Sequence, residues 1–353
     1  MRDADAYPQY QLSHDPTCTA CHLTPAGGGL LTENGLMVAE NESWKGTDPT
    51  FFYGAPLPSW LRMSGDIRGA AGAVDNGVFN GAAYPMQAEA YASAGARGFS
   101  LNLTGGFRRP QDGGSPAHVV WSREHFLMWQ QHPEDPYGLY VRVGRLMPVF
   151  GLRLAEHVVY TQRFGGYPLY GEAYAAAVAY VSARFEAHLT GFIHDPIGSP
   201  VEHGDGGAGY VEVRLGKDKH AQVGAEGKYA AADDLHRTYV GLTGKVYFPS
   251  VDLLVQAEAQ LVHQEIVSTS YTYNQLIGYV LASRPIVHGW LLDVGVGHFT
   301  QNTDVDGNYR DCIDANVHWF VTSHLELLAT TRLELLGSGP NGGYALAQLH
   351  YRL

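Results

Sequence analysis

The sequence predicts an all-β fold, a transmembrane antiparallel β-barrel of about 16 strands that follows a short N-terminal segment. Three observations support this prediction. Only 16% of the 353 residues are charged, while 43 are Gly and 22 are Tyr, whereas soluble domains carry about a quarter charged residues. From Ser59 to the last residue, apolar and polar residues alternate with a period of two. The segments that alternate are joined by turns that are short and long in succession.

The composition excludes several other classes of protein. No apolar run reaches the roughly 20 residues of a membrane-spanning helix, and the longest candidate, Ala173 to Ala183, is too short. A net charge of −12 without a dense basic run argues against a nucleic-acid partner. Three cysteines are too few for a disulfide framework. A barrel that alternates lipid-facing and lumen-facing residues explains both the low charge and the missing apolar runs.

Each strand was assigned from this alternation. In the clearest segment, 251–263, every second residue is apolar and most of the intervening residues are polar. The sixteen predicted strands are 59–73, 83–94, 98–108, 118–130, 137–147, 172–182, 184–194, 207–216, 219–229, 236–247, 251–264, 271–283, 286–298, 309–320, 324–336 and 343–353. The segment 304–308 has the acidic residues of a calcium loop but lacks the late Glu, so a polar hairpin turn is the simpler interpretation.

The turns indicate the orientation of the barrel. Connections after even-numbered strands are mostly tight, whereas those after odd-numbered strands are mostly long and include 109–117, 148–171, 195–206 and 300–308. In outer-membrane barrels the short turns face the periplasm and the long loops face outward. We therefore expect a protein of the bacterial outer membrane, in contact with its lipid. An even number of strands places both termini on the periplasmic side.

Two short stretches resemble known outer-membrane proteins. Residues 344–353 place apolar residues at alternate positions and resemble the C-terminal strand by which such proteins are recognised for insertion, although the chain ends on Leu353 rather than on an aromatic residue. Residues 143–152 resemble a strand-and-loop phrase of porin-type barrels. The first six residues contain no apolar signal core, so we expect the numbering to describe a chain whose export signal has been removed.

The first 57 residues differ from the remainder and contain the clearest chemical motif. They are irregular and rich in Pro and Gly, so the chain divides into residues 1–57 and residues 58–353. Cys18 and Cys21 precede His22 in a Cys-x-x-Cys-His motif, the attachment signature of c-type haem. Two thioethers hold the macrocycle, and the adjacent histidine is an axial iron ligand. We predict one covalent haem c, carried by a segment that forms a plug or periplasmic cap.

Other interpretations of the motif are weaker. A zinc site needs two further ligands, and no second cysteine pair exists. A thioredoxin-like pair should lie between a strand and a helix, which this Pro- and Gly-rich segment does not offer. Coincidence is also a weaker explanation, because two of the three cysteines in the chain occur together. The motif does not decide which residue is the sixth ligand of the iron. Met37 is our candidate, since Met is a common partner, but it also fits an ordinary apolar contact, and His14 and His188 are alternatives.

A single haem segment followed by a barrel of about 16 strands resembles the fused outer-membrane cytochrome–porins, whose best-known members are iron oxidases. The resemblance rests on the haem motif, Pro25, Leu30-Leu31 and the strand pattern after Ser59, and it is broken at 33–36, where the family tends to carry aromatic-Gly-Arg. It implies electron transfer across the outer membrane, with a periplasmic or multihaem cytochrome and an extracellular electron donor or acceptor as partners, and Fe(II) oxidation as one form of it. A sleeve or relay subunit of a larger porin–cytochrome conduit, and a diffusion porin without redox role, remain alternatives.

Overall fold

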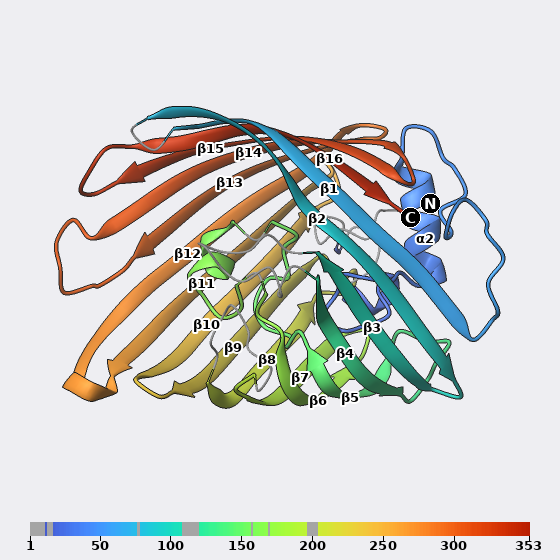
Figure 1. Ribbon diagram of the computed structural model, residues 1–353, viewed down its shortest axis with the longest axis horizontal. Coiled ribbons are helices and arrows are strands. Elements are labelled where there is room, and N and C mark those ends of the chain that lie inside the picture. Colours follow the sequence, from blue (N-terminus) through green and yellow to red (C-terminus); the bar gives the residue numbers. More distant parts are fainter. Residues whose placement is uncertain are drawn as a thin grey trace.

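The computed structural model describes residues 11–12, 17–75, 78–107, 120–156, 158–168, 170–195 and 204–353. Within this part of the chain sixteen strands form one closed antiparallel barrel, in which every strand pairs with its neighbour in sequence and β16 closes on β1 (Figure 1). The predicted fold class is therefore confirmed. None of the helices in the described residues is long and apolar enough to span a membrane.

The observed strands match the predicted ones closely. Their bounds are β1 Leu61–Asp75, β2 Phe79–Ala96, β3 Phe99–Phe107, β4 Val120–Gln130, β5 Gly138–Leu146, β6 Ala173–Val181, β7 Phe185–Ile193, β8 Asp205–Leu215, β9 Ala221–Ala232, β10 Leu235–Phe248, β11 Leu253–Ile266, β12 Tyr271–Val287, β13 Trp290–Thr300, β14 Tyr309–Thr322, β15 Leu325–Leu336 and β16 Gly342–Arg352. The helices are α1 Cys18–Cys21, α2 Glu33–Glu42 and α3 Tyr160–Arg163, with a short 3₁₀ turn at Val267–Thr269.

The alternation places polar side chains inside the barrel and apolar side chains outside. In β11, Gln256, Glu258 and Gln260 are buried, while Leu261 is 44% exposed. Leu242 on β10, at 68% exposure, shows the outer face of a neighbouring strand. Polar side chains are thus buried in the lumen and apolar ones lie on the outside, the reverse of a soluble protein and the pattern of a membrane barrel.

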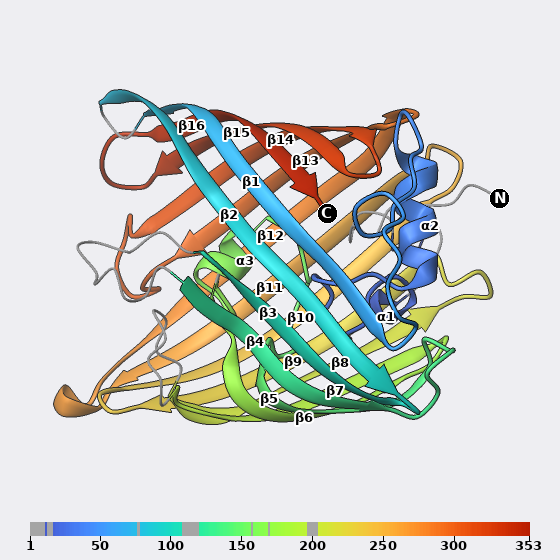
Figure 2. The same cartoon turned by 45° about the vertical axis from the view of Figure 1, so that its right-hand side comes forward.

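Tight turns and long loops lie at opposite ends, as predicted. β2 and β3 are joined by Arg97 and Gly98 alone, whose positive φ angles of 54° and 83° close the hairpin. The end of β16 pairs with the start of β1 at this tight-turn end, where α1 and α2 also lie (Figure 2). The predicted loop 109–117 lies outside the described residues, and 304–308 forms a hairpin turn in which Asp304 N donates to Asn302 Oδ1 at 2.9 Å.

The connection between β5 and β6 folds into the lumen, which the strand pattern did not predict. Its buried apolar residues are Phe150, Leu152, Leu154, Val159, Tyr160 and Tyr167. They pack against apolar side chains on the inner face of the barrel wall, among them Phe192, Val262, Ile277 and Phe299. We call residues 147–172 the inserted loop. Because its apolar residues are removed from water by the wall, burial of that surface holds the loop inside the barrel.

The N-terminal segment closes the tight-turn end, and we call residues 11–57 the cap. Thr32 begins α2, because its Oγ1 accepts from Gly35 N at 3.1 Å. On the inner face of α2, Val38 packs with Leu291 of β13 and Phe320 of β14. The chain then docks on the β14–β15 turn, where Trp44 N donates to Phe320 O at 2.7 Å. These contacts hold the segment at this end of the barrel, and its role as a haem-bearing plug or periplasmic cap stays a prediction.

Candidate haem site and its surroundings

The haem motif forms a single helical turn. Cys18 and Cys21 begin and end α1, and His22 N donates to Cys18 O at 2.8 Å. The start of α2 lies directly against this turn, so that a Cβ on Gly35 would collide with the Cys21 carbonyl oxygen. Only glycine permits so close an approach between the two helices. The packing of α2 therefore fixes the orientation of the motif.

The His22 ring is held by the backbone of the glycine turn that follows it. His22 Nδ1 lies 3.1 Å from Gly28 O, and the turn returns to the motif where Leu23 N donates to Leu30 O at 3.0 Å. Gly28 has a φ of 68° and Gly27 a φ of 76°, in the left-handed region that favours glycine. When Nδ1 carries the proton and donates to Gly28 O, Nε2 keeps its lone pair. This is the usual arrangement of a histidine that ligates a metal through Nε2.

The two thiols are not joined to each other. Within the described part of the chain, none of Cys18, Cys21 and Cys312 forms a disulfide. Gln11 Nε2 donates to Cys18 Sγ at 3.0 Å and Asn34 Nδ2 donates to Cys21 Sγ at 3.5 Å. Burial raises the pKa of the Cys18 thiol. Among the described residues, Cys18, Cys21 and His22 do not belong to a group of three ligand atoms close enough to hold a metal ion.

The motif lines a cavity in the lumen. Its volume is about 780 Å³, and Cys18, Cys21 and His22 all contribute to its wall. The opposite sides come from the inserted loop, through residues such as Phe150, and from the barrel wall, through residues such as His318. Small-molecule and cofactor sites fall in the range of about 300–1,000 Å³. The residues and the space therefore fit a covalently attached haem.

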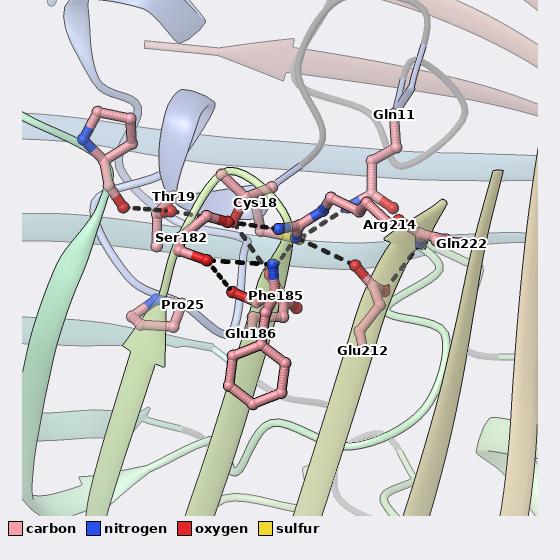
Figure 3. A network of polar contacts seen from close by, with 12 residues as sticks. Gln11, Cys18, Thr19, Pro25, Ser182, Phe185, Glu186, Glu212, Arg214 and Gln222 are labelled. Carbon is pink, nitrogen blue, oxygen red and sulfur yellow. Dashed lines mark hydrogen bonds and ion pairs between the residues drawn. The ribbon is translucent and has the colours of Figure 1, made fainter. Parts of the chain in front are cut away.

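Charged groups of the barrel wall hold the cap in place (Figure 3). Arg214 of β8 lies 2.6 Å from Glu186 of β7 and 3.1 Å from Glu212 of β8, and all three side chains are at most 1% exposed. The cap joins this cluster through Thr17 Oγ1, which donates to Glu186 Oε2 at 3.2 Å. It also joins through Gln11 Oε1, which accepts from Lys245 Nζ at 2.6 Å. Charge-assisted hydrogen bonds of this kind are stronger than neutral ones.

Arg153 connects the inserted loop with both the cap and the wall. Its Nη1 donates to Pro25 O at 2.9 Å, and its Nη2 lies 2.6 Å from Glu186 Oε1. Pro25 belongs to the turn that follows the haem motif. Burial disfavours the charged form of Arg153, but the nearby carboxylates of Glu186 and Glu212 hold its pKa well above its usual value. One guanidinium therefore ties together the three elements around the motif.

The three candidates for the sixth iron ligand differ in where they lie relative to the cavity. Met37 lies on α2 beside Val38, but its side chain is 45% exposed and is not part of the cavity wall. The reason is geometric, because the inner face of α2 is occupied by Gly35 and Val38. His188 is buried, with Nε2 3.4 Å from Glu186 Oε1, and His14 lies outside the described residues. The structure thus brings Cys18, Cys21 and His22 to one cavity but does not bring Met37 to it.

A second group of polar residues on this cavity was not singled out from the sequence. Glu156 of the inserted loop approaches Asp293 of β13 and His318 of β14. Burial and the nearby Asp293 carboxylate raise the pKa of Glu156 to about 7. The alternation of β13 and β14 indicated that Asp293 and His318 face the lumen. Nothing in the sequence indicated that a loop residue more than a hundred positions away joins them.

Comparison with known proteins identifies the fold. OmpT of Vibrio cholerae in its trimer form superposes with a TM-score of 0.64 at 12% identity, over 83% of this chain and 99% of that one. An anion-selective porin from Comamonas acidovorans gives 0.60 at 11% identity, over 83% and 99%, and Salmonella typhi OmpF, in a complex with daunomycin, gives 0.61 at 9% identity, over 83% and 97%. No family model and no curated protein matches the sequence. The chain therefore has the fold of a porin-like outer-membrane barrel.

Proposed function

We propose that the protein transfers electrons across the bacterial outer membrane through one haem c bound to Cys18, Cys21 and His22. The observation that carries the proposal is the position of the motif. All three residues line one lumen cavity, and Gly28 O fixes the imidazole with Nε2 as the ligand atom. A haem bound there supplies one-electron redox chemistry. With the tight turns on the periplasmic side, both the cap and the chain termini face the periplasm.

The residues around the motif suit this role. The inserted loop fills part of the lumen and the cap closes its tight-turn end, and Arg153 joins the two next to the motif. The buried ion pair between Arg153 and Glu186 helps to hold the motif in one orientation. The hydrocarbon core of a membrane is about 30 Å thick, so a periplasmic or multihaem cytochrome and an extracellular donor or acceptor are the partners that this role requires. Fe(II) is the donor that the resemblance to cytochrome–porins favours.

The proposal is tested by a pyridine haemochrome assay on detergent-purified protein, expressed together with a cytochrome c maturation system. We expect one covalently bound haem per chain. The C18A/C21A variant should bind none, because both thioether positions are gone. The C312A variant is the matched control and should keep its haem, since Cys312 lies on β14 outside the motif. Wild-type protein without haem under these conditions would contradict the proposal.

A diffusion porin is the second candidate, because the structures that superpose on the barrel include porins. It predicts ion conductance in planar bilayers and no haem, whereas the electron-transfer role predicts haem and a low conductance through the filled lumen. A relay subunit of a larger conduit predicts haem together with a multihaem cytochrome that co-purifies in stable stoichiometry. The haem assay, the conductance and the co-purification thus separate the three.

A further inference from the structure

Three side chains that can ligate metals converge on the cavity from three separate elements. Glu156 belongs to the inserted loop, Asp293 to β13 and His318 to β14, and each offers one ligand atom within 4.8 Å of the other two. His318 Nε2 lies 3.2 Å from Asp293 Oδ2 and 4.0 Å from Glu156 Oε1. Glu156 and His318 line the cavity, so a small ion that enters the cavity reaches the cluster.

The His318 ring is held in place through its Nδ1, on the side away from Asp293 and Glu156. Its Nδ1 lies 2.6 Å from Glu326 Oε1 of β15, and its ring stacks on Phe320, with centroids 5.9 Å apart and an interplanar angle of 23°. A carboxylate that accepts from Nδ1 leaves Nε2 directed at Asp293 and Glu156, and a metal ion would replace the proton that Nε2 donates to Asp293 Oδ2. Metal-ligating histidines commonly have this carboxylate behind them, because it fixes the ring and makes the ligand nitrogen more basic.

The cluster also carries excess negative charge. Glu156, Asp293 and Glu326 surround His318, and Glu326 Oε2 further lies 3.0 Å from His350 Nδ1 of β16. His350 Nε2 is in turn 2.8 Å from Asp66 Oδ1 of β1. At His318 itself, three carboxylates therefore face one imidazole, and the second imidazole, that of His350, is shared between Glu326 and Asp66. Within the described part of the chain, the solvent-shielded Glu156 Oε2 has no hydrogen-bond partner, so this oxygen is available to a cation.

We propose that Glu156, Asp293 and His318 bind a divalent first-row transition-metal ion such as Zn²⁺ or Mn²⁺. One imidazole with two carboxylates is a donor set for these ions rather than for Mg²⁺ or Ca²⁺, which take oxygen ligands. Ligand atoms about 2.1 Å from one ion lie at most about 4.2 Å apart. The widest separation in the cluster is therefore slightly too long and shortens on binding. Glu156, on the loop, is the ligand that moves most readily. The site shares the cavity with the haem motif but uses none of the motif's residues.

The test is isothermal titration of Zn²⁺ into detergent-purified protein that has been treated with a chelator and then freed of it. Because free thiols also bind Zn²⁺, the titration is done in the C18A/C21A variant as well as in the haem-loaded wild type. We expect one ion per chain in both, and an affinity at least 100-fold weaker in D293N. In E156Q we expect a loss of about 10-fold, the lower end of the range found for residues that only support metal ligands, because Gln keeps an oxygen that can still bind the ion. A Mn²⁺ titration followed by electron paramagnetic resonance provides an independent readout.

The barrel contains a matched control. His298 of β13 and Asp311 of β14 also form a His–carboxylate pair at 2.7 Å, but both side chains are more than 40% exposed. The D311N variant should therefore leave the Zn²⁺ affinity unchanged. Heat-modifiable migration on gels confirms that each variant barrel is folded, and E156Q keeps the test decisive if D293N fails to fold. The absence of binding, or binding that neither D293N nor E156Q weakens, would show that the cluster is an ion-pair network only.

Discussion

The inserted loop fills part of the lumen and the cap closes its tight-turn end, yet different forces hold the two in place. The loop buries a continuous apolar surface against the wall, including Leu152 and Tyr160, which are at most 2% exposed. The cap buries fewer large apolar side chains, those of Leu12, Leu31 and Val38, and its contacts with the wall include hydrogen bonds to charged residues such as Glu186 and Lys245. A loop held by apolar burial is an intrinsic part of the barrel. A cap held by a few polar contacts depends on each of them.

The largest effect, on the fraction of chains that carry covalent haem, is expected at the contact between α1 and α2 of the cap. In G35V, the new side chain would collide with the Cys21 carbonyl oxygen and push α2 away from the haem motif. We expect the fraction of chains with covalent haem to fall at least 10-fold, measured by the haemochrome assay, while the barrel stays heat-modifiable on gels. The exposed Met37 on the same helix provides the control, since M37V should leave the haem content unchanged. Equal haem in G35V and wild type would show that the α1–α2 contact does not position the motif.

A smaller effect is expected where the cap meets the wall. In R214M, the carboxylates of Glu186 and Glu212 lose their shared guanidinium. Breaking a buried ion pair by removal of one partner costs about 3–5 kcal/mol when the other charge is left alone. Because Arg153 and Lys245 stay paired with Glu186 and Glu212, we expect a smaller loss of stability, seen as a lower midpoint of urea unfolding and a looser cap. Arg184, exposed in the β6–β7 turn and bonded to Gly216 O, allows a matched control. If R214M proved as stable as R184M, the buried charges would not be what holds the cap.

We expect L152A to have the smallest effect on the cap. Its effect should be confined to the inserted loop. Leu152 is 2% exposed within the apolar cluster of the lumen. Truncation of a buried Leu to Ala costs about 2–5 kcal/mol, so the loop should loosen and the single-channel conductance in planar bilayers should rise, while haem content is retained. R163A alters a half-exposed residue of the same loop and should change neither. Loss of haem in L152A would mean that loop and cap are not separately held.

Much of the fold was predictable from local pattern. The outward face of β11 and the tight turn at Arg97 follow from a period of two and from turn chemistry, both of which act over a few residues. The haem motif was readable for the same reason, because Cys18, Cys21 and His22 are neighbours in sequence. Met37 was chosen because Met is a common partner of haem iron and lies close to the motif in sequence, but the structure places its side chain on the exposed face of α2.

The sequence by itself determined the sixteen strands, their lumen and lipid faces, and the motif with its expected haem, because each depends on residues close together in the chain. Only the tertiary structure decided that the inserted loop enters the lumen, that Arg153 links it to Pro25 and Glu186, and that Glu156 meets Asp293 and His318. These contacts form because closure of the barrel brings distant strands to face one interior. That closure is a property of the whole sheet and leaves no trace in any short stretch of sequence.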